Sequence, residues 1–148
     1  MRPGRGCHCG RAATGVWDLA DRSLDELSGG QRQRVWIALA LAQDADTMLL
    51  DEPATFLDLA HQLEILDLVQ DLNRDQGKTI VLVLHDLNLA ARYADYLIAL
   101  KNGEVVTAGT PADVITSAVV EQVFGLSSEV IPDPLTGTPL VLSRPRRP

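Results

Sequence analysis

The sequence lacks several features that would place it in a common class of protein. Its longest apolar runs, residues 35–42 and 80–84, are far shorter than the roughly 20 residues of a membrane span. No segment near its start has the apolar run of a signal peptide, so we expect a protein of the reducing cytosol. Basic residues are scarce, 13 against 20 acidic, and the net charge of −7 argues against nucleic acid as a partner.

Cysteine is scarce too, and both cysteines lie in the tripeptide Cys7-His8-Cys9. These are residue types of a zinc site, but three ligands so close in sequence seldom reach the corners of one tetrahedron without a second cluster. The sequence has no second cluster. We therefore interpret residues 1–10, which are rich in Gly, Arg and Cys, as a disordered N-terminal segment.

The sequence also lacks a phosphate loop of the form G-x-x-x-x-G-K-[ST]. Gly77-Lys78-Thr79 resembles the end of such a loop, but Leu72 stands where its first glycine would be. The tripeptide also precedes a predicted strand instead of opening a helix. We interpret it as a helix-to-strand turn.

Helical and strand patterns alternate through the middle of the chain, which predicts an α/β fold with a mostly parallel sheet and flanking helices. The predicted helices include residues 29–43, 57–73 and 110–124. The predicted strands include residues 47–50, whose apolar run suggests burial on both faces, and residues 79–84, 96–100 and 104–108. Asn102-Gly103 predicts a hairpin turn, and residues 130–142 a final small hairpin. The core-facing stripes are predicted as Val35, Ala38, Leu39 and Ala42 on the first helix and Leu63, Leu66, Val69 and Leu72 on the second.

Residues 27–34 read Leu-Ser-Gly-Gly-Gln-Arg-Gln-Arg and open the first of these helices. Ser28 and Gln31 have the spacing of a capping box. Gly29 and Gly30 leave backbone N–H groups bare at the positive end of the helix dipole, which suits an anion. Taken alone, the run fits an ordinary helix cap and a phosphate site equally well.

Asp51 and Glu52 follow a predicted strand, where ligands commonly bind in open α/β sheets. One carboxylate can hold hydrated Mg²⁺ while the other orients a water molecule, although a solvated loop is the alternative. His85 follows the next strand, 85 − 51 = 34 residues later, so we expect it at the same edge of the sheet. It could donate to a phosphate, or be a structural histidine; His8 and His61 have no comparable context.

In combination these motifs resemble those of ABC-type ATPases: residues 27–34 its signature motif, residues 48–53 its Walker B motif and Leu57-Asp58 its D-loop. Residues 11–143 are similar to the C-terminal part of a bacterial importer ATPase. The runs 51–62, 83–88 and 131–139 are closest to the subgroup that serves iron–siderophore and cobalamin uptake. Ala54 departs from the usual threonine. The resemblance implies a partial P-loop NTPase domain over residues 11–148, with an incomplete sheet.

The resemblance also implies a role for each motif residue. Asp51 would support Mg²⁺, Glu52 would activate water, His85 would be the switch histidine and Asp58 would communicate across a dimer. The residues assigned to ATP held by an opposing subunit are Ser28, Gly29, Gly30 and Gln31. The implied partners are a second ATPase subunit (identical or different), membrane permease subunits and, indirectly, a substrate-binding protein. The expected location is the cytoplasmic face of the cell membrane.

The earlier half of the family's domain, with its Walker A lysine, has no counterpart here. We therefore expect a truncated importer ATPase that is inactive alone, with open apolar surface and poor solubility. One alternative is a non-catalytic partner that presents its signature motif to an intact ATPase. Another is a non-transport ATPase of DNA repair or translation, against which the His85-Asp86 pair and the acidic charge argue.

Overall fold

The computed structural model describes residues 14–55 and 57–145, so the segment predicted to be disordered, with Cys7, His8 and Cys9, lies outside the described residues. The chain forms two compact units, Met1–Val83 and Leu84–Pro148, which we call the N-terminal and C-terminal units.

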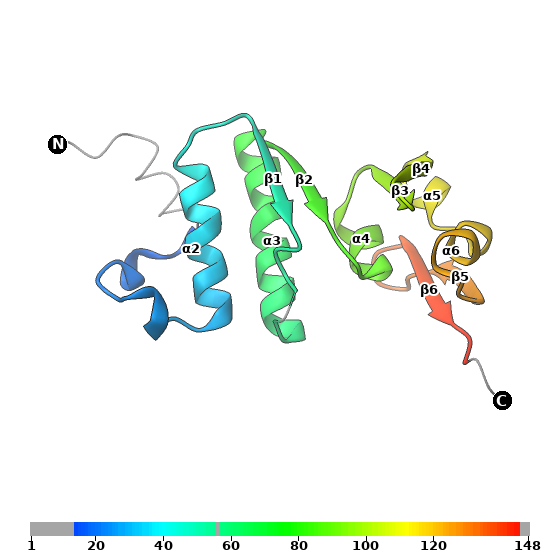
Figure 1. Ribbon diagram of the computed structural model, residues 1–148, viewed down its shortest axis with the longest axis horizontal. Helices are drawn as coiled ribbons and strands as arrows, with labels where there is room; N and C mark the ends of the chain where they lie inside the picture. Colours follow the sequence, from blue (N-terminus) through cyan, green and yellow to red (C-terminus); the bar gives the residue numbers. More distant parts are fainter. Residues whose placement is uncertain (1–13, 56, 146–148) are drawn as a thin grey trace. The chain divides into compact units, whose positions relative to one another are not determined.

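The N-terminal unit is a helix–strand–helix–strand arrangement (Figure 1). Two short 3₁₀ helices, η1 (Trp17–Leu19) and η2 (Leu24–Glu26), precede α2 (Gly29–Leu41), β1 (Thr47–Asp51), α3 (Leu59–Gln76) and β2 (Thr79–Val83). The two strands pair in parallel, from Thr47 opposite Thr79 to Asp51 opposite Val83, and α3 is the crossover helix. Gly77 ends α3 in a left-handed conformation at φ 62°, so the Gly77-Lys78-Thr79 run is the helix-to-strand turn that was predicted.

Aliphatic side chains from both helices and both strands form the core of this unit. Its buried members are Ile37, Leu41, Met48, Ile65, Val69 and Leu72. On α3 the predicted stripe is confirmed at Leu66, Val69 and Leu72, all buried. On α2 it was wrong at Leu39, which is 55% exposed. Ile37 and Leu41 face the core instead, and a residue two positions from Ile37 points to the opposite side of the helix.

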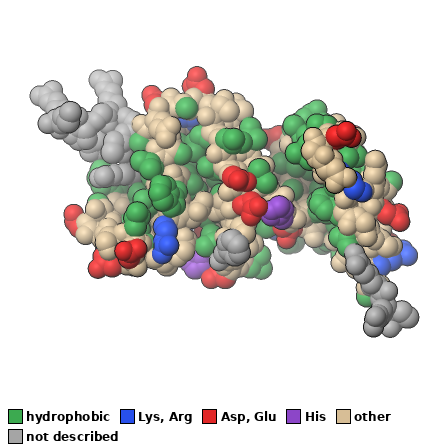
Figure 2. All heavy atoms as spheres, viewed as in Figure 1, with side chains coloured by type: hydrophobic (Ala, Val, Ile, Leu, Met, Phe, Trp, Pro, Cys, Tyr) green, Lys and Arg blue, Asp and Glu red, His purple; other side chains and the backbone are tan. Residues whose placement is uncertain are grey.

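Burial of β1 on both faces was also predicted, and this was wrong. Met48 is 4% exposed, whereas its neighbour Leu49 is 73% exposed. Val81 and Val83 of β2 are exposed as well. Figure 2 shows hydrophobic side chains at several places on the surface. Successive strand residues point to opposite faces, and in the described part of the chain the core cluster lies on only one of them. The sheet therefore keeps an open apolar face.

The C-terminal unit contains α4 (Leu87–Tyr93), β3 (Leu97–Lys101), β4 (Glu104–Gly109), α5 (Pro111–Val114), α6 (Ser117–Phe124), β5 (Ser128–Pro132) and β6 (Pro139–Ser143). Asn102 and Gly103 join β3 to β4 with φ values of 52° and 81°, as the predicted hairpin turn requires. The final hairpin is confirmed as β5 paired with β6. The single helix over residues 110–124 was wrong: α5 ends at Val114, and Thr116 starts α6 by accepting from the Val119 N–H at 3.3 Å.

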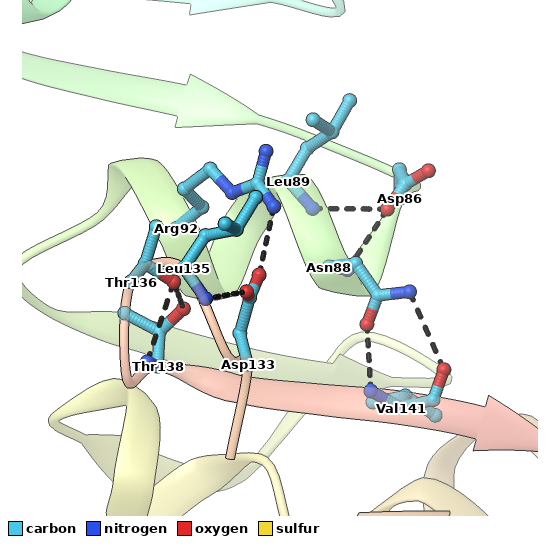
Figure 3. A network of polar contacts seen from close by, with 9 residues as sticks. All are labelled: Asp86, Asn88, Leu89, Arg92, Asp133, Leu135, Thr136, Thr138 and Val141. Carbon is cyan, nitrogen blue, oxygen red and sulfur yellow. Dashed lines mark hydrogen bonds and ion pairs between the residues drawn. The ribbon is translucent and has the colours of Figure 1, made fainter. Parts of the chain in front are cut away.

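A polar network ties α4 to the β5–β6 hairpin within this unit (Figure 3). Asp86 caps α4, accepting from the N–H groups of Asn88 at 2.8 Å and Leu89 at 2.9 Å. The Asn88 side chain then binds both backbone groups of Val141. Its Oδ1 accepts from the Val141 N–H at 2.7 Å, and its Nδ2 donates to the Val141 carbonyl at 3.3 Å.

One turn further along α4, Arg92 makes the second link. Its Nη2 donates to Asp133 Oδ2 at 2.7 Å, and the Leu135 N–H donates to Asp133 Oδ1 at 2.8 Å. The Asp133 side chain is only 7% exposed. The guanidinium of Arg92 holds the pKa of this carboxyl below its ordinary value, with the Leu135 N–H acting in the same direction. A buried charge is thus paired and hydrogen-bonded, as burial requires.

Candidate functional site

The start of α2 has the capping box that the spacing of Ser28 and Gln31 offered as one of two alternatives. Ser28 Oγ accepts from the Gln31 N–H at 3.3 Å, and Gln31 Oε1 accepts from the Ser28 N–H at 3.0 Å. In this arrangement the Ser28 hydroxyl proton is still available to a ligand. Within the described residues the N–H groups of Gly29 and Gly30 donate to no protein acceptor. A capping box and an anion site are therefore compatible here.

Gly29 and Gly30 also allow α2 to lie close to the start of α3. A Cβ atom added at Gly30 would lie 2.7 Å from Cδ2 of His61, and one at Gly29 would lie 3.2 Å from Cδ2 of Leu57. The first distance is a clash for any side chain. The sequence suggested that these glycines expose backbone to a ligand. The structure adds that Gly30 is needed for packing against His61 and that Gly29 makes a tight contact with Leu57.

Asp58 begins α3, as the N-cap residue. Its Oδ1 accepts from the His61 N–H at 3.0 Å and lies 2.8 Å from His61 Nδ1. These bonds, the backbone one foremost, lower the pKa of Asp58. Sequence reasoning missed His61, although its position three residues after an N-cap aspartate was the available signal.

Asp51 and Glu52 stand where β1 ends. Asp51 is exposed and paired in register with Val83 of β2. Glu52 has φ 48°, a left-handed conformation that costs a residue with a side chain about 1–3 kcal/mol. A turn follows, in which the Thr55 N–H donates to the Glu52 carbonyl at 3.2 Å and Pro53 is fully buried. The surrounding turn thus holds Glu52 in a strained position beside Asp51.

These residues suit Mg²⁺ only in combination with a ligand. Among the residues described, no three His, Cys, Asp or Glu side chains are grouped so as to hold a metal by themselves. Mg²⁺ is usually held by one or two carboxylates together with waters and ligand phosphates. An exposed Asp51 at the end of a strand fits that mode.

His85 is exposed and lies in the C-terminal unit, directly before the Asp86 cap of α4. Asp51 belongs to the N-terminal unit, so the expected meeting of the two side chains stays a prediction. No helix in the described ranges is both long and apolar enough to cross a membrane.

Comparisons with known proteins agree with the motifs. Residues 8–55 match the sequence model of the family described as "ABC transporter". The chain is 57% identical over 129 residues to the achromobactin transport ATP-binding protein CbrD of Dickeya dadantii, covering 87% of this chain and 48% of that protein. It is 54% identical over 130 residues to the ferric enterobactin transport ATP-binding protein FepC of Escherichia coli, with 88% and 48% covered. The chain thus spans about half the length of the curated relatives it matches.

Among solved structures, an ABC transporter in an inward-facing conformation matches with a TM-score of 0.86 and 28% identity. The match covers 96% of this chain and 58% of that one. CbiO1 of Clostridium perfringens, part of the ABC transporter complex cbiONQ, matches with a TM-score of 0.70 and 30% identity, over 80% of this chain and 47% of that one.

Proposed function

The chain belongs to the ABC transporter ATP-binding family, and on that premise we propose that it supplies the signature and Walker B portion of an importer's ATP-binding subunit. The cargo would be an iron–siderophore complex or a related metal chelate. This proposal is supported by relatives whose names specify achromobactin and ferric enterobactin transport.

The start of α2 is the observation that carries the proposal. The Ser28 hydroxyl would bind the γ-phosphate of ATP held by an opposing subunit, together with the N–H groups of Gly29 and Gly30, which donate to no acceptor among the described residues. Gln31 fixes Ser28 through the capping box. A site of this kind needs no nucleotide bound to its own chain. It therefore also favours a second candidate, a non-catalytic partner that serves an intact ATPase.

The remaining motif residues would act on a nucleotide in their own subunit. Bound Mg²⁺ would neutralise phosphate charge, with Asp51 holding its water ligands. Glu52 would orient the attacking water, His85 would donate to the γ-phosphate, and Asp58 would contact the opposing subunit. Residues 11–148 would form this portion of the domain. The partners would be a second ATPase subunit, identical or different, membrane permease subunits and, through them, a substrate-binding protein, at the cytoplasmic face of the membrane.

The test distinguishes binding to ATP held by another subunit from ATP hydrolysis by this chain itself. Because the sequence has no phosphate loop, the purified chain should hydrolyse no ATP. Mixed with the intact ferric enterobactin ATP-binding subunit of Escherichia coli, it should associate in the presence of ATP, measured by light scattering, and raise ATP turnover. Ser28→Arg should abolish both effects, whereas Asp75→Asn, on the exposed end of α3, should change neither. Equal association by the wild-type and Ser28→Arg chains would refute the proposal.

A further inference from the structure

We propose that His61 is a positioning residue that joins the start of the signature helix α2 to Asp58, so that the two move as one body. This inference rests on the proposed function, in which the start of α2 touches a nucleotide and Asp58 touches the opposing subunit. It assigns a role to a histidine that no motif of the sequence singled out.

The first half of the link is steric. The His61 ring fills the space where a side chain at Gly30 would stand, with its Cδ2 only 2.7 Å from the position of a Cβ there. Gly30 is buried, so the ring and the helix backbone cannot part without opening a void. A displacement of the first turn of α2 therefore displaces the imidazole.

The second half of the link is polar. His61 Nδ1 lies 2.8 Å from Asp58 Oδ1, and the His61 backbone N–H donates to the same oxygen at 3.0 Å. The ring nitrogen and the backbone N–H of His61 thus both contact Oδ1 of the carboxylate. Moving the ring reorients the carboxylate.

A parallel pair of contacts supports the same junction. Leu57 Cδ2 approaches Gly29 as the His61 ring approaches Gly30. Gln62 Nε2 donates to the Leu57 carbonyl at 3.0 Å, which fixes the residue before Asp58 to the first turn of α3. The two adjacent glycines of α2 therefore pack against Leu57, which precedes Asp58, and His61, which binds its carboxylate.

In the proposed dimer, contacts between α2 and α3 would couple phosphate binding at the start of α2 to the orientation of Asp58 at the subunit boundary. A γ-phosphate drawn to Gly29 and Gly30 would pull the first turn of α2, and through His61 would set the direction of Asp58 at the subunit boundary. Binding in trans and the state of Asp58 would then be linked inside one chain.

Two substitutions separate the steric half from the polar half. His61→Phe keeps a ring against Gly30 but loses the nitrogen that faces Asp58. His61→Asn restores a side-chain N–H at the same number of bonds from Cα as Nδ1. With the intact ferric enterobactin subunit, His61→Phe should lower kcat for ATP by about tenfold and leave KM nearly unchanged, since small misplacements at a reacting site are costly. His61→Asn should recover most of kcat, and Asp75→Asn should match wild type.

A second measurement needs no partner and no ATP turnover. In the isolated chain, NMR titration of the Asp58 carboxyl should shift the amide resonances of Gly29 and Gly30 in wild type and in His61→Asn, but not in His61→Phe. Loss of the shift in His61→Phe with rescue by His61→Asn supports the link; a full shift in His61→Phe overturns it. If the wild-type chain shows no ATP-dependent association, the proposed function fails and the NMR result alone decides the inference.

Discussion

The N-terminal unit joins helix to sheet with aliphatic side chains, whereas the C-terminal unit joins helix to hairpin with an amide, a guanidinium and a carboxylate. The first has the cluster around Ile37 and Ile65. The second buries apolar residues as well, Val120 among them, but α4 and the β5–β6 hairpin are tied by Asn88 and Arg92. The two units should therefore respond to different perturbations: the first to lost volume, the second to lost charge.

The largest effect is expected from Ile65→Ala in the N-terminal unit. Ile65 is 1% exposed in the centre of the core cluster, and removing its buried methyl and methylene groups should lower the free energy of unfolding by about 2–5 kcal/mol. Hydrogen exchange should rise over α2 and α3 but not over β5 and β6. Leu59→Ala, at a position 67% exposed, is the matched control and should change little. Equal loss of protection in both units would erase the contrast between them.

Acid should weaken the link between α4 and the β5–β6 hairpin in the C-terminal unit. Because the pKa of Asp133 is lowered in the folded chain, its pairing with Arg92 stabilises the fold fully above the ordinary pKa of about 3.9. That stability is lost as pH falls through the lowered folded value. Exchange protection at Leu135 and Val141 should therefore fall in this acidic window.

Asp133→Asn is the control for the acid effect. It should be less stable than wild type at neutral pH and should lack the acid-dependent step, since its side chain does not titrate. An acid-dependent step that survives in Asp133→Asn would assign the effect to another group. Asp113 lies in the same unit, and hydrogen bonds from the Thr110 hydroxyl and N–H lower its pKa too, so it would be the next carboxylate to replace.

The smallest effect concerns the strained residue at the end of β1. Glycine adopts the left-handed conformation of Glu52 freely, whereas alanine does not. Glu52→Gly should therefore be more stable than Glu52→Ala by about 1 kcal/mol, measured by urea unfolding. The reverse order would mean that the turn relaxes when the carboxylate is removed. Either variant should fail as the water-activating residue under the proposed function.

Local sequence patterns predicted most of the helices, strands and turns, but few of the contacts between them. The Asn102-Gly103 turn and the Gly77 turn each depend on residues adjacent in sequence, and both were predicted. The Ser28 capping box was one of two alternatives that the local pattern left open. Exposure of Leu49 could not be, because a continuous apolar run does not specify how many layers cover a strand. The split between α5 and α6 depended on Thr116, whose weak capping signal lay inside a favourable helical pattern.

In the candidate site, too, the sequence indicated the motif residues but not the contacts that depend on packing. The motif residues stood out by type and spacing, and the cap that fixes Ser28 was one of the alternatives they left open. The contact of His61 with Gly30 joins two helices, and the Asn88 pairing with Val141 joins residues 53 positions apart. No periodicity encodes such contacts, since each depends on how complete elements pack.

Asn88 has one further consequence, for self-association. Its side-chain amide occupies the N–H and C=O of Val141 much as a neighbouring strand would, so no foreign strand can pair with β6 at that point. In the described part of the chain β1 and β2 pair only with each other. If copies of this chain aggregate by strand addition, the new backbone hydrogen bonds should form along β1 or β2, and charged substitutions at Leu49 or Val81 should suppress them.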